Sequence, residues 1–219
     1  MPALRTIYSF IYSPAGKQLS LYQQLFKAKP KRPQKYARKP RKTPIPNRVS
    51  IDLRPVVASD RSQFCHWEGD LVHYQCQHEN LLTLQGRKFC LTLIAKNSSK
   101  HKKGTHQMIC SRLKLFPKIA RKSATFDNGG EFADHEKLHS LECKAFLCDP
   151  YTSWQKSGFE HANGRIRRLL PKHTNLAEIS HAEIERIQRI LNNTPMKCLD
   201  YQTPTEVFLS NINTRCTSN

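Results

Sequence analysis

Three acidic residues are the strongest candidates for chemistry in this 219-residue chain: Asp70, Asp127 and Glu160. Carboxylates that converge from separate elements can hold two Mg²⁺ ions roughly 3.5–4 Å apart, which stabilise the attacking and leaving oxygens of an in-line displacement at phosphorus. Mg²⁺ prefers hard oxygen ligands, so Asp and Glu suit it and cysteine does not. Because the chain has 17 Asp and Glu residues, three of them can be chosen in many ways, and metal-assisted phosphoryl transfer is only a hypothesis at this point.

Asp70 lies inside the strand-like segment 66–76, HWEGDLVHYQC. A charged residue beside Leu71 and Val72 within a strand needs an ionic partner, a bound metal or an edge position. This requirement makes Asp70 a candidate metal ligand.

Asp127 lies in TFDNGGEF, residues 125–132, where Asn-Gly is a strong signal for a tight hairpin turn. The residues that follow, EFADHEKLHSL, favour a helix over about 131–142 instead of a second strand. The glycines therefore indicate a strand-to-helix crossing that leaves Asp127 at the carboxyl end of a strand, where open sheets place ligands. Glu131 is expected to serve the N-terminus of that helix, where negative charge is favoured.

Glu160 lies near the start of a predicted helix over about 158–170. One face of this helix carries the apolar residues expected to be buried, Phe159, Ala162, Ile166, Leu169 and Leu170. A neighbouring face presents, at helical intervals, Glu160, Asn163, Gly164 and Arg167. A glycine inside a helix costs about 1 kcal/mol relative to alanine, so Gly164 indicates either a close approach to the helix or a tolerated defect. Positive charge beside the carboxylate, as a phosphate-handling surface requires, comes from Arg165, Arg167 and Arg168.

The composition favours a polyanionic partner. The 36 Lys and Arg residues exceed the 17 acidic residues and give a formal net charge of +19, which repels itself unless a polyanion is nearby. Nucleic acid fits best, because neutralised phosphates release condensed counterions; a solvated basic surface and anionic lipid are the alternatives. No stretch approaches the ~20 apolar residues that span a bilayer, and the first residues lack a signal-peptide pattern. We expect a cytoplasmic protein with no membrane partner.

The positive charge is concentrated near the N-terminus. Residues 27–48 combine it with five prolines and almost no apolar side chains, which predicts an extended basic arm. The arm is either a plain solubilising linker or a segment that follows DNA phosphates. In the second case its expected DNA contacts are Lys35, Arg38, Lys39, Arg41 and Lys42.

From Cys65 onward the pattern is that of a folded domain. Strands are predicted at 66–76, 88–97, about 122–126 and 143–148. Helices are predicted at 105–116, 131–142, 158–170, 180–193 and 204–210. This order indicates an α/β domain with a mixed sheet flanked by helices. The length allows one large domain or a domain of about 150 residues with an extension.

The eight cysteines contain no CxxC pair, and reduced thiols are expected in a cytosolic protein. One set has the composition of a zinc site: His135, His139, Cys143 and Cys148. The two histidines fall on a predicted helix and the two cysteines bracket a predicted strand, so buried or incidental roles are favoured over zinc.

Four motifs occur in the order and approximate spacing of bacterial insertion-sequence transposases: HWEGDLV, FDNGGEFADHEKL, FLCDPYTSWQKSGFEHANGRIRRLLP and LNNTPMKCLDYQTPTEVF. Over roughly residues 44–210 the chain closely resembles the insertion-sequence-thirty family, whose Asp-Asp-Glu core has a ribonuclease-H-like fold shared with retroviral integrases. The resemblance implies a mixed five-stranded sheet flanked by helices and preceded by the basic arm. It also implies that the catalytic, metal-binding triad is Asp70, Asp127 and Glu160, with Mg²⁺ or Mn²⁺ as cofactor.

The resemblance further implies a transposase that cuts DNA at the ends of its element and joins those ends to a target, as a homo-oligomer in the bacterial cytoplasm, associated with the nucleoid. The implied domains are a helix-turn-helix remnant at 1–26, a basic linker at 27–60 and the catalytic core at 61–219. DNA contacts would come from the arm and from the motif SWQKSG, which contains Trp154, Gln155 and Lys156; Trp154 has a capping or packing role as its alternative. Further expected contacts are Asn163, Arg165, Arg167 and Arg168.

The chain departs from the family pattern at two places. Family members usually carry Glu-Asn-Thr-Asn-Gly where this chain has EHANG, so His161 and Ala162 replace Asn and Thr. His161 either reaches a substrate oxygen or, as is favoured, faces solvent. Full-length members begin with helix-turn-helix segments, of which ALRTIYSFIYSPAGKQL resembles only the tail. The alternative function is therefore a truncated, catalytically impaired form that binds DNA or full-length transposase as a regulator, and a nuclease without strand transfer is a weaker third.

Overall fold

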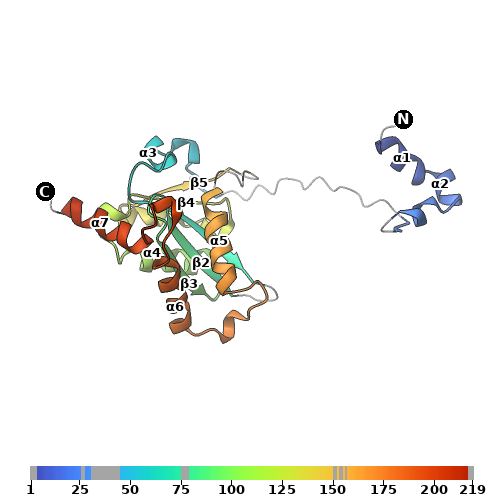
Figure 1. The fold of residues 1–219 in the computed structure, drawn as a ribbon. Helices are drawn as coiled ribbons and strands as arrows, with labels where there is room; N and C mark the ends of the chain where they lie inside the picture. Colours follow the sequence, from blue (N-terminus) through green and yellow to red (C-terminus); the bar gives the residue numbers. More distant parts are fainter. Residues whose placement is uncertain are drawn as a thin grey trace. The chain divides into compact units, whose positions relative to one another are not determined.

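The computed structural model describes residues 4–25, 28–30, 45–74, 79–149, 152, 155 and 157–216. The chain divides into two compact units, residues 1–41 and 42–219 (Figure 1). Among the described residues, none of the helices combines the length and the apolar character needed to cross a membrane.

The first unit contains α1 (Leu4–Ile11), α2 (Pro14–Gln18) and the 3-10 helix η1 (Leu21–Gln24). Ser13 caps α2, because its hydroxyl oxygen accepts a hydrogen bond of 3.2 Å from the backbone N–H of Gly16. Gly16 packs so closely on the end of α1 that a Cβ there would collide with the carbonyl of Phe10, so this turn requires glycine. The assignment of this unit as a helix-turn-helix remnant stays a prediction.

The second unit is built on a five-stranded sheet of β1 (His66–His73), β2 (Asn80–Gly86), β3 (Thr92–Asn97), β4 (Ser123–Phe126) and β5 (Lys144–Leu147). The strand order is β3-β2-β1-β4-β5. Strands β1, β2 and β3 pair antiparallel, whereas β4 pairs parallel with both β1 and β5. The predicted mixed five-stranded sheet is confirmed.

Helices cover both faces of this sheet. The α-helices of the unit are α3 (Val56–Ser59), α4 (Lys102–Leu113), α5 (Ser157–Leu169), α6 (His181–Asn192) and α7 (Pro204–Cys216). The 3-10 helices are η2 (Ile51–Leu53), η3 (Lys118–Ala120), η4 (Gly130–Phe132), η5 (His135–Leu141), η7 (Leu176–Glu178) and η8 (Lys197–Leu199). In Figure 1, α5 runs across the front of the sheet.

Two apolar clusters lie on opposite faces of the sheet. The first joins Trp67 and Leu71 of β1 to α4 and to Phe208 of α7, and the second joins Val72 of β1 to α5 and α6. Because side chains alternate along a strand, Glu68 and Asp70 share the face of Val72, which α5 covers.

The predicted elements differ from the observed ones where the local pattern is weak. The sequence pattern does not predict strand β2, which is buried along its whole length and so lacks the alternation that marks a half-exposed strand. Strand β3 begins at Thr92 because the preceding residues form the turn from β2, with Cys90 at φ 56°. The predicted helix at 131–142 consists of the 3-10 helices η4 and η5, and Leu169, predicted to be buried, is 39% exposed.

Candidate active site

Asp70 lies on β1, and Asp127 follows directly after β4, the parallel neighbour of β1. The pairs between β1 and β4 are His66 with Ser123, Trp67 with Ala124, and Glu68 with Thr125, each 57 positions apart. Asp70 and Asp127 are separated by the same 57 positions, so the same register brings them level two residues further along. Asp127 directly follows the last residue of β4, at the carboxyl end of a strand as predicted.

We call Asp70 and Asp127 the carboxylate row. A hydrogen bond joins helix α5 to Asp70 in this row. The side-chain Nδ2 of Asn163 donates to Oδ2 of Asp70 at 3.1 Å. Position 160 precedes position 163 by three residues, and residues three apart lie on the same face of a helix. Glu160 lies in the first turn of α5, although its side chain is outside the described part of the structure. These relationships agree with a site beside the end of β4, and the assembly of the three acids into one metal site stays a prediction.

Asp127 takes part in the turn as well as in the row. Its Oδ1 accepts a hydrogen bond of 3.1 Å from the backbone N–H of Gly129, which is an Asx-type turn. This bond fixes the orientation of the carboxylate, as outer hydrogen bonds do for metal ligands. Glu131 lies in the first turn of η4, the position predicted for it, and its carboxylate folds back over Gly129.

Two amide oxygens beside these acids have no hydrogen-bond partner among the described residues: Oδ1 of Asn163 and Oδ1 of Asn128. Both atoms are buried, and an unpartnered buried polar atom costs about 1–3 kcal/mol. Asn163 contacts Asp70, and Asn128 follows Asp127 in the chain. Carboxylate and amide oxygens are the hard donors that Mg²⁺ accepts, so the residues present fit a divalent metal ion.

Below this row, the face of the sheet that α5 covers is filled by a paired ionic layer. The carboxylate of Glu68, 3% exposed, forms ion pairs with Arg87 and Arg54. Arg87 also donates to the carbonyl oxygens of Ala58 at 2.7 Å and Ser59 at 3.1 Å, and burial lowers its pKa to about 10. Glu68 is therefore held by protein cations.

His66, two residues before Glu68 on β1, lies on the same face of the sheet. Its Nδ1 lies 2.7 Å from the hydroxyl of Ser123 and its Nε2 lies 2.9 Å from Oε1 of Gln63. Burial lowers the pKa of His66 to about 4, with smaller contributions from the positive charges of Lys122, Arg54 and Arg87. His66 is consequently neutral at physiological pH and supports the strands instead of exchanging protons.

Comparison with known proteins finds several transposases that are similar to this chain. The transposase for IS4351 from Bacteroides fragilis is 32% identical over 218 residues, which is 97% of this chain and 65% of that protein. The transposase for IS1086 from Cupriavidus metallidurans is 32% identical over 206 residues, or 93% of this chain and 61% of that protein. Transposase InsI of IS30A from Escherichia coli K12 is 35% identical over 165 residues, or 75% of this chain and 43% of that protein. The chain is therefore similar to transposases of the IS30 family.

The chain spans between 43% and 65% of the length of these three relatives. No protein-family model matches it. Among solved structures, the catalytic core domain of BIV integrase aligns with a TM-score of 0.57 at 16% identity, covering 70% of this chain and 99% of that domain. A chain of the simian T-cell lymphotropic virus intasome aligns with a TM-score of 0.54 at 17% identity, covering 65% of this chain and 53% of that one. The chain therefore has the predicted ribonuclease-H-like fold.

The basic residues of α5 differ in their surroundings. Arg165 donates to the carbonyl oxygen of Leu191 and lies 3.2 Å from Sδ of Met196, and burial lowers its pKa. It thus ties α5 to the end of α6, whereas Arg167 and Arg168 are exposed. The other predicted DNA contacts lie outside the described residues: Lys35, Arg38, Lys39, Arg41, Lys42 and Lys156.

The two unusual positions of α5 are open to solvent. A Cβ built at Gly164 would have no heavy atom within 4 Å, so no described part of the chain approaches this glycine. The space above it is available to a ligand. His161 is exposed, as the favoured interpretation predicted, and it lines a cleft of about 230 Å³ together with Glu68, Gln85 and Arg87.

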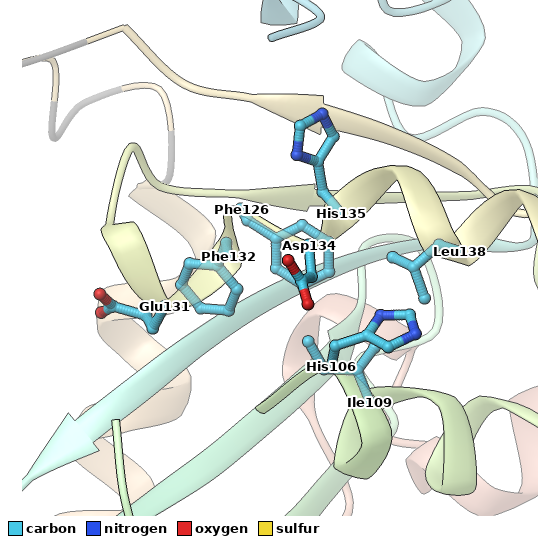
Figure 2. Close-up of a pocket in the computed structure, with 8 residues that line it drawn as sticks. All are labelled: His106, Ile109, Phe126, Glu131, Phe132, Asp134, His135 and Leu138. Carbon is cyan, nitrogen blue, oxygen red and sulfur yellow. The ribbon is translucent and has the colours of Figure 1, made fainter. Parts of the chain in front are cut away.

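The opposite face of the sheet holds a small pocket, which Figure 2 shows beneath η4 and η5. Its volume is about 10 Å³, room for one water molecule at most. Asp134 in this pocket pairs with Lys137 at 2.6 Å and Lys102 at 3.4 Å. In Figure 2 the Glu131 carboxylate points away from Asp134. The pocket is therefore too small to hold a substrate.

The possible zinc set does not assemble in the part of the chain that the structure describes. No group of three or more His, Cys, Asp or Glu side chains there could hold a metal ion, and the set of His135, His139, Cys143 and Cys148 is therefore not supported. Burial raises the pKa of Cys143 to about 12, whereas a zinc ligand must be a thiolate. The observed burial of His135, Cys143 and Cys148 agrees with the structural alternative.

Proposed function

We propose that this transposase cleaves DNA and transfers the cut strand by two-metal phosphoryl transfer, with Asp70, Asp127 and Glu160 as the metal ligands. The observation that carries the proposal is the hydrogen bond from Asn163 to Asp70. It sets the Glu160 face of α5 against the strand that bears Asp70, in the row shared with Asp127. The names of the relatives, all transposases for insertion sequences, support the same activity.

Each residue of the row has a distinct task. Mg²⁺ or Mn²⁺, when bound, supplies the positive charge that activates the attacking oxygen and stabilises the leaving oxygen. The Asx-type bond to Gly129 keeps the Asp127 carboxylate in one orientation, and Asn163 does the same for Asp70. A water molecule attacks first and a DNA 3′-hydroxyl then attacks the target strand, so one site serves both cleavage and joining.

DNA is the proposed substrate at both steps, as element ends and as target. The exposed Arg167 and Arg168 supply charge next to the carboxylate row. The arm residues, from Lys35 to Lys42, and Lys156 supply sequence-independent phosphate contacts. Since cutting two ends requires two active sites, we propose a homo-oligomer that works on DNA in the cytoplasm. The regulatory alternative has no support from the relatives, which are named as transposases.

The test is a cleavage and joining assay on linear DNA that carries the terminal sequences flanking this reading frame, with and without Mg²⁺. Asp127→Asn preserves shape and removes charge, and we expect it to lose at least about a hundredfold in rate, the scale seen when a group that stabilises transition-state charge is removed. The matched control is Asp200→Asn. Asp200 is exposed at φ 52°, a conformation that Asn also tolerates, so the control keeps full activity. Equal activity of wild type and Asp127→Asn contradicts the assignment.

A further inference from the structure

A short segment, residues 45–50, lies along the outer edge of β5, and we call it the strap. The backbone N–H of Leu147 donates to the carbonyl oxygen of Val49 at 2.9 Å, and Ser50 pairs with Leu147 as a parallel bridge. At the other end of the strap, Ile45 is buried in the core. The sequence predicts these residues as part of a linker, whereas they pack on the catalytic unit.

His135 holds the middle of the strap. Its Nε2 lies 3.3 Å from the carbonyl oxygen of Asn47, to which it donates. The ring is 4% exposed, and in Figure 2 it points away from the stacked rings of Phe126 and Phe132. Because a buried polar ring needs a partner, this hydrogen bond fixes the strap to η5 as well as to β5.

Arg48 reaches from the strap to the point where the chain leaves β5. Its Nη2 donates to the carbonyl oxygens of Cys148 at 3.1 Å and Leu147 at 3.5 Å, and it forms an ion pair with Asp149. The side chains of Arg48 and Asp149 are 29% and 35% exposed, so the ion pair alone contributes little stability. These bonds instead fix the path of the chain after Leu147.

Asp149 is in turn hydrogen-bonded to Gln155, which precedes α5 in the sequence. Its Oδ2 accepts a hydrogen bond from Nε2 of Gln155 at 3.1 Å, and its own backbone N–H donates to Oε1 of Gln155 at 2.9 Å. The same Oε1 accepts from the hydroxyl of Thr152 at 2.8 Å. The bonds from Arg48 and then from Gln155 hold the pKa of Asp149 below its usual range.

One end of this hydrogen-bond network lies beside Asp127, and the other end lies at Gln155, shortly before α5 in the sequence. The backbone N–H of Cys148 donates to the carbonyl oxygen of Phe126 at 2.9 Å, and Phe126 directly precedes Asp127. Gln155 lies two positions before Ser157, where α5 begins, and Glu160 follows in the first turn. A short path of hydrogen bonds thus runs from the end of β4 to Gln155, two positions before α5 begins.

We propose that Arg48, Asp149 and Gln155 are positioning residues, which hold the start of α5 and with it Glu160 at a fixed place relative to Asp127. The inference rests on the proposed function only for the metal-binding role of Glu160. Gln155, expected from sequence to contact DNA, acts through Asp149 in this account. The competing explanation is that the strap merely covers the open edge of β5, as edge strands require.

The first arm of the test measures cleavage rate against Mg²⁺ concentration for wild type, Arg48→Ala, Arg48→Lys, Gln155→Ala and the double Ala variant. For Arg48→Ala and Gln155→Ala we expect the Mg²⁺ concentration at half-maximal rate to rise about tenfold, the scale typical of outer partners of metal ligands. The double variant is no worse than either single one, because all act in one network. Arg48→Lys recovers part of the loss. The matched control is Arg186→Ala, which removes an exposed arginine paired with Glu183 and leaves the metal dependence unchanged.

The second experiment does not depend on catalytic activity of the protein. Hydrogen exchange of backbone amides compares the first turns of α5, residues 157–163, with the helix α6. Arg48→Ala and Gln155→Ala speed exchange at the start of α5 at least about threefold and leave α6 unchanged, whereas a strap that only covers the edge of β5 leaves both unchanged. If Arg48→Ala does not fold, Gln155→Ala carries the same test, since the bonds of Gln155 described above run to Asp149 and Thr152 and not to the strap.

The two arms separate the two proposals. A wild-type protein with no metal-dependent cleavage overturns the proposed function, and the exchange data then still judge the network. An active wild type whose Arg48→Ala and Gln155→Ala variants keep the wild-type Mg²⁺ dependence overturns the positioning role, whatever the exchange data show.

Discussion

The side-chain amide of Asn163 on α5 donates a 3.1 Å hydrogen bond to Oδ2 of Asp70 on β1, across 93 positions of the sequence. This bond links α5 directly to the carboxylate row in the described structure of the site. It orients one oxygen of Asp70 and sets the helix face of Glu160 toward the same point. Substitutions of Asn163, and of the residues that support the row, therefore have distinct expected effects.

Asn163→Ala removes the donor and leaves the backbone of α5 intact. We expect cleavage activity to fall by about tenfold, because an outer hydrogen bond to a metal ligand is lost, while the unfolding midpoint changes little at this half-buried site. Steady-state cleavage at saturating Mg²⁺ and thermal unfolding measure the two effects. A large drop in stability with unchanged activity would mean that Asn163 only packs the helix.

Asn163→Asp places a second carboxylate within hydrogen-bond distance of Asp70. Two like charges at this distance raise the pKa of one of them, so the protonated form of the pair persists to higher pH. Activity should therefore rise toward higher pH in the variant, with its acidic limb shifted upward relative to wild type. The pH–rate profile measures this shift, and superimposable profiles would show that the two side chains do not interact in solution.

Glu68→Gln tests the ionic layer below the site. The substitution leaves the buried guanidinium of Arg87 without its counter-charge, and removing one partner of a buried pair costs about 3–5 kcal/mol. The matched control is Glu183→Gln, which breaks an exposed pair on α6 and costs less than about 1 kcal/mol. Urea unfolding measures the loss of unfolding free energy in both variants. Equal losses would show that Glu68 is not buried as the structure has it.

The neutral state of His66 makes stability depend on pH. The folded pKa of about 4 lies below the unfolded value of 6.5, so the unfolded chain binds the proton more readily between these values. Stability from this group is complete above pH 6.5 and falls as the pH drops toward 4, by about 2–3 kcal/mol in total. His66→Gln removes the titrating group, and the difference between the two proteins in urea unfolding at about pH 7.5 and about pH 4.5 isolates His66 from the carboxylates. A constant difference across this range would contradict the prediction.

The basic arm should govern the salt dependence of DNA binding. Replacing Lys35, Arg38, Lys39, Arg41 and Lys42 with Gln reduces the slope of log affinity against log salt by roughly one for each DNA phosphate that the arm no longer neutralises. Fluorescence anisotropy on a non-specific duplex at several salt concentrations gives the slope. Lys118→Gln is the control, because its exposed ammonium already pairs with Glu142. An unchanged slope would show that the arm is a plain linker.

Local sequence patterns were sufficient for the elements that carry the proposed acids. β1, β4 and α5 each have a clear period or a strong boundary, such as the glycines after Asp127, and their observed limits lie within a few residues of the prediction. By contrast, β2 is buried on both faces and has no alternation. Leu169, the last residue of α5, is exposed, whereas Ile166 and Leu170 of the same predicted stripe are buried.

The contacts between elements were beyond the reach of local patterns. The register that makes Asp70 level with Asp127 depends on long-range pairing of β1 with β4. The strap was hidden at the end of a stretch rich in prolines and positive charges, although Ile45 within it and Ile51 just after it are apolar and are buried in the structure. The sequence places Asn163 only beside Glu160 on the helix, and its partner Asp70 is visible only in three dimensions.

The most direct test of the metal assignment is chain cleavage by Fe²⁺ bound in place of Mg²⁺, with ascorbate and peroxide present. Hydroxyl radicals formed at the bound ion cut the backbone close to it, and mass spectrometry maps the cuts. We predict cuts clustered near residues 70, 127 and 160, which disappear with excess Mg²⁺ and in Asp127→Asn but persist in Asp200→Asn. Cuts elsewhere, or an Asp127→Asn pattern identical to wild type, would contradict the assignment of these three acids as the metal ligands.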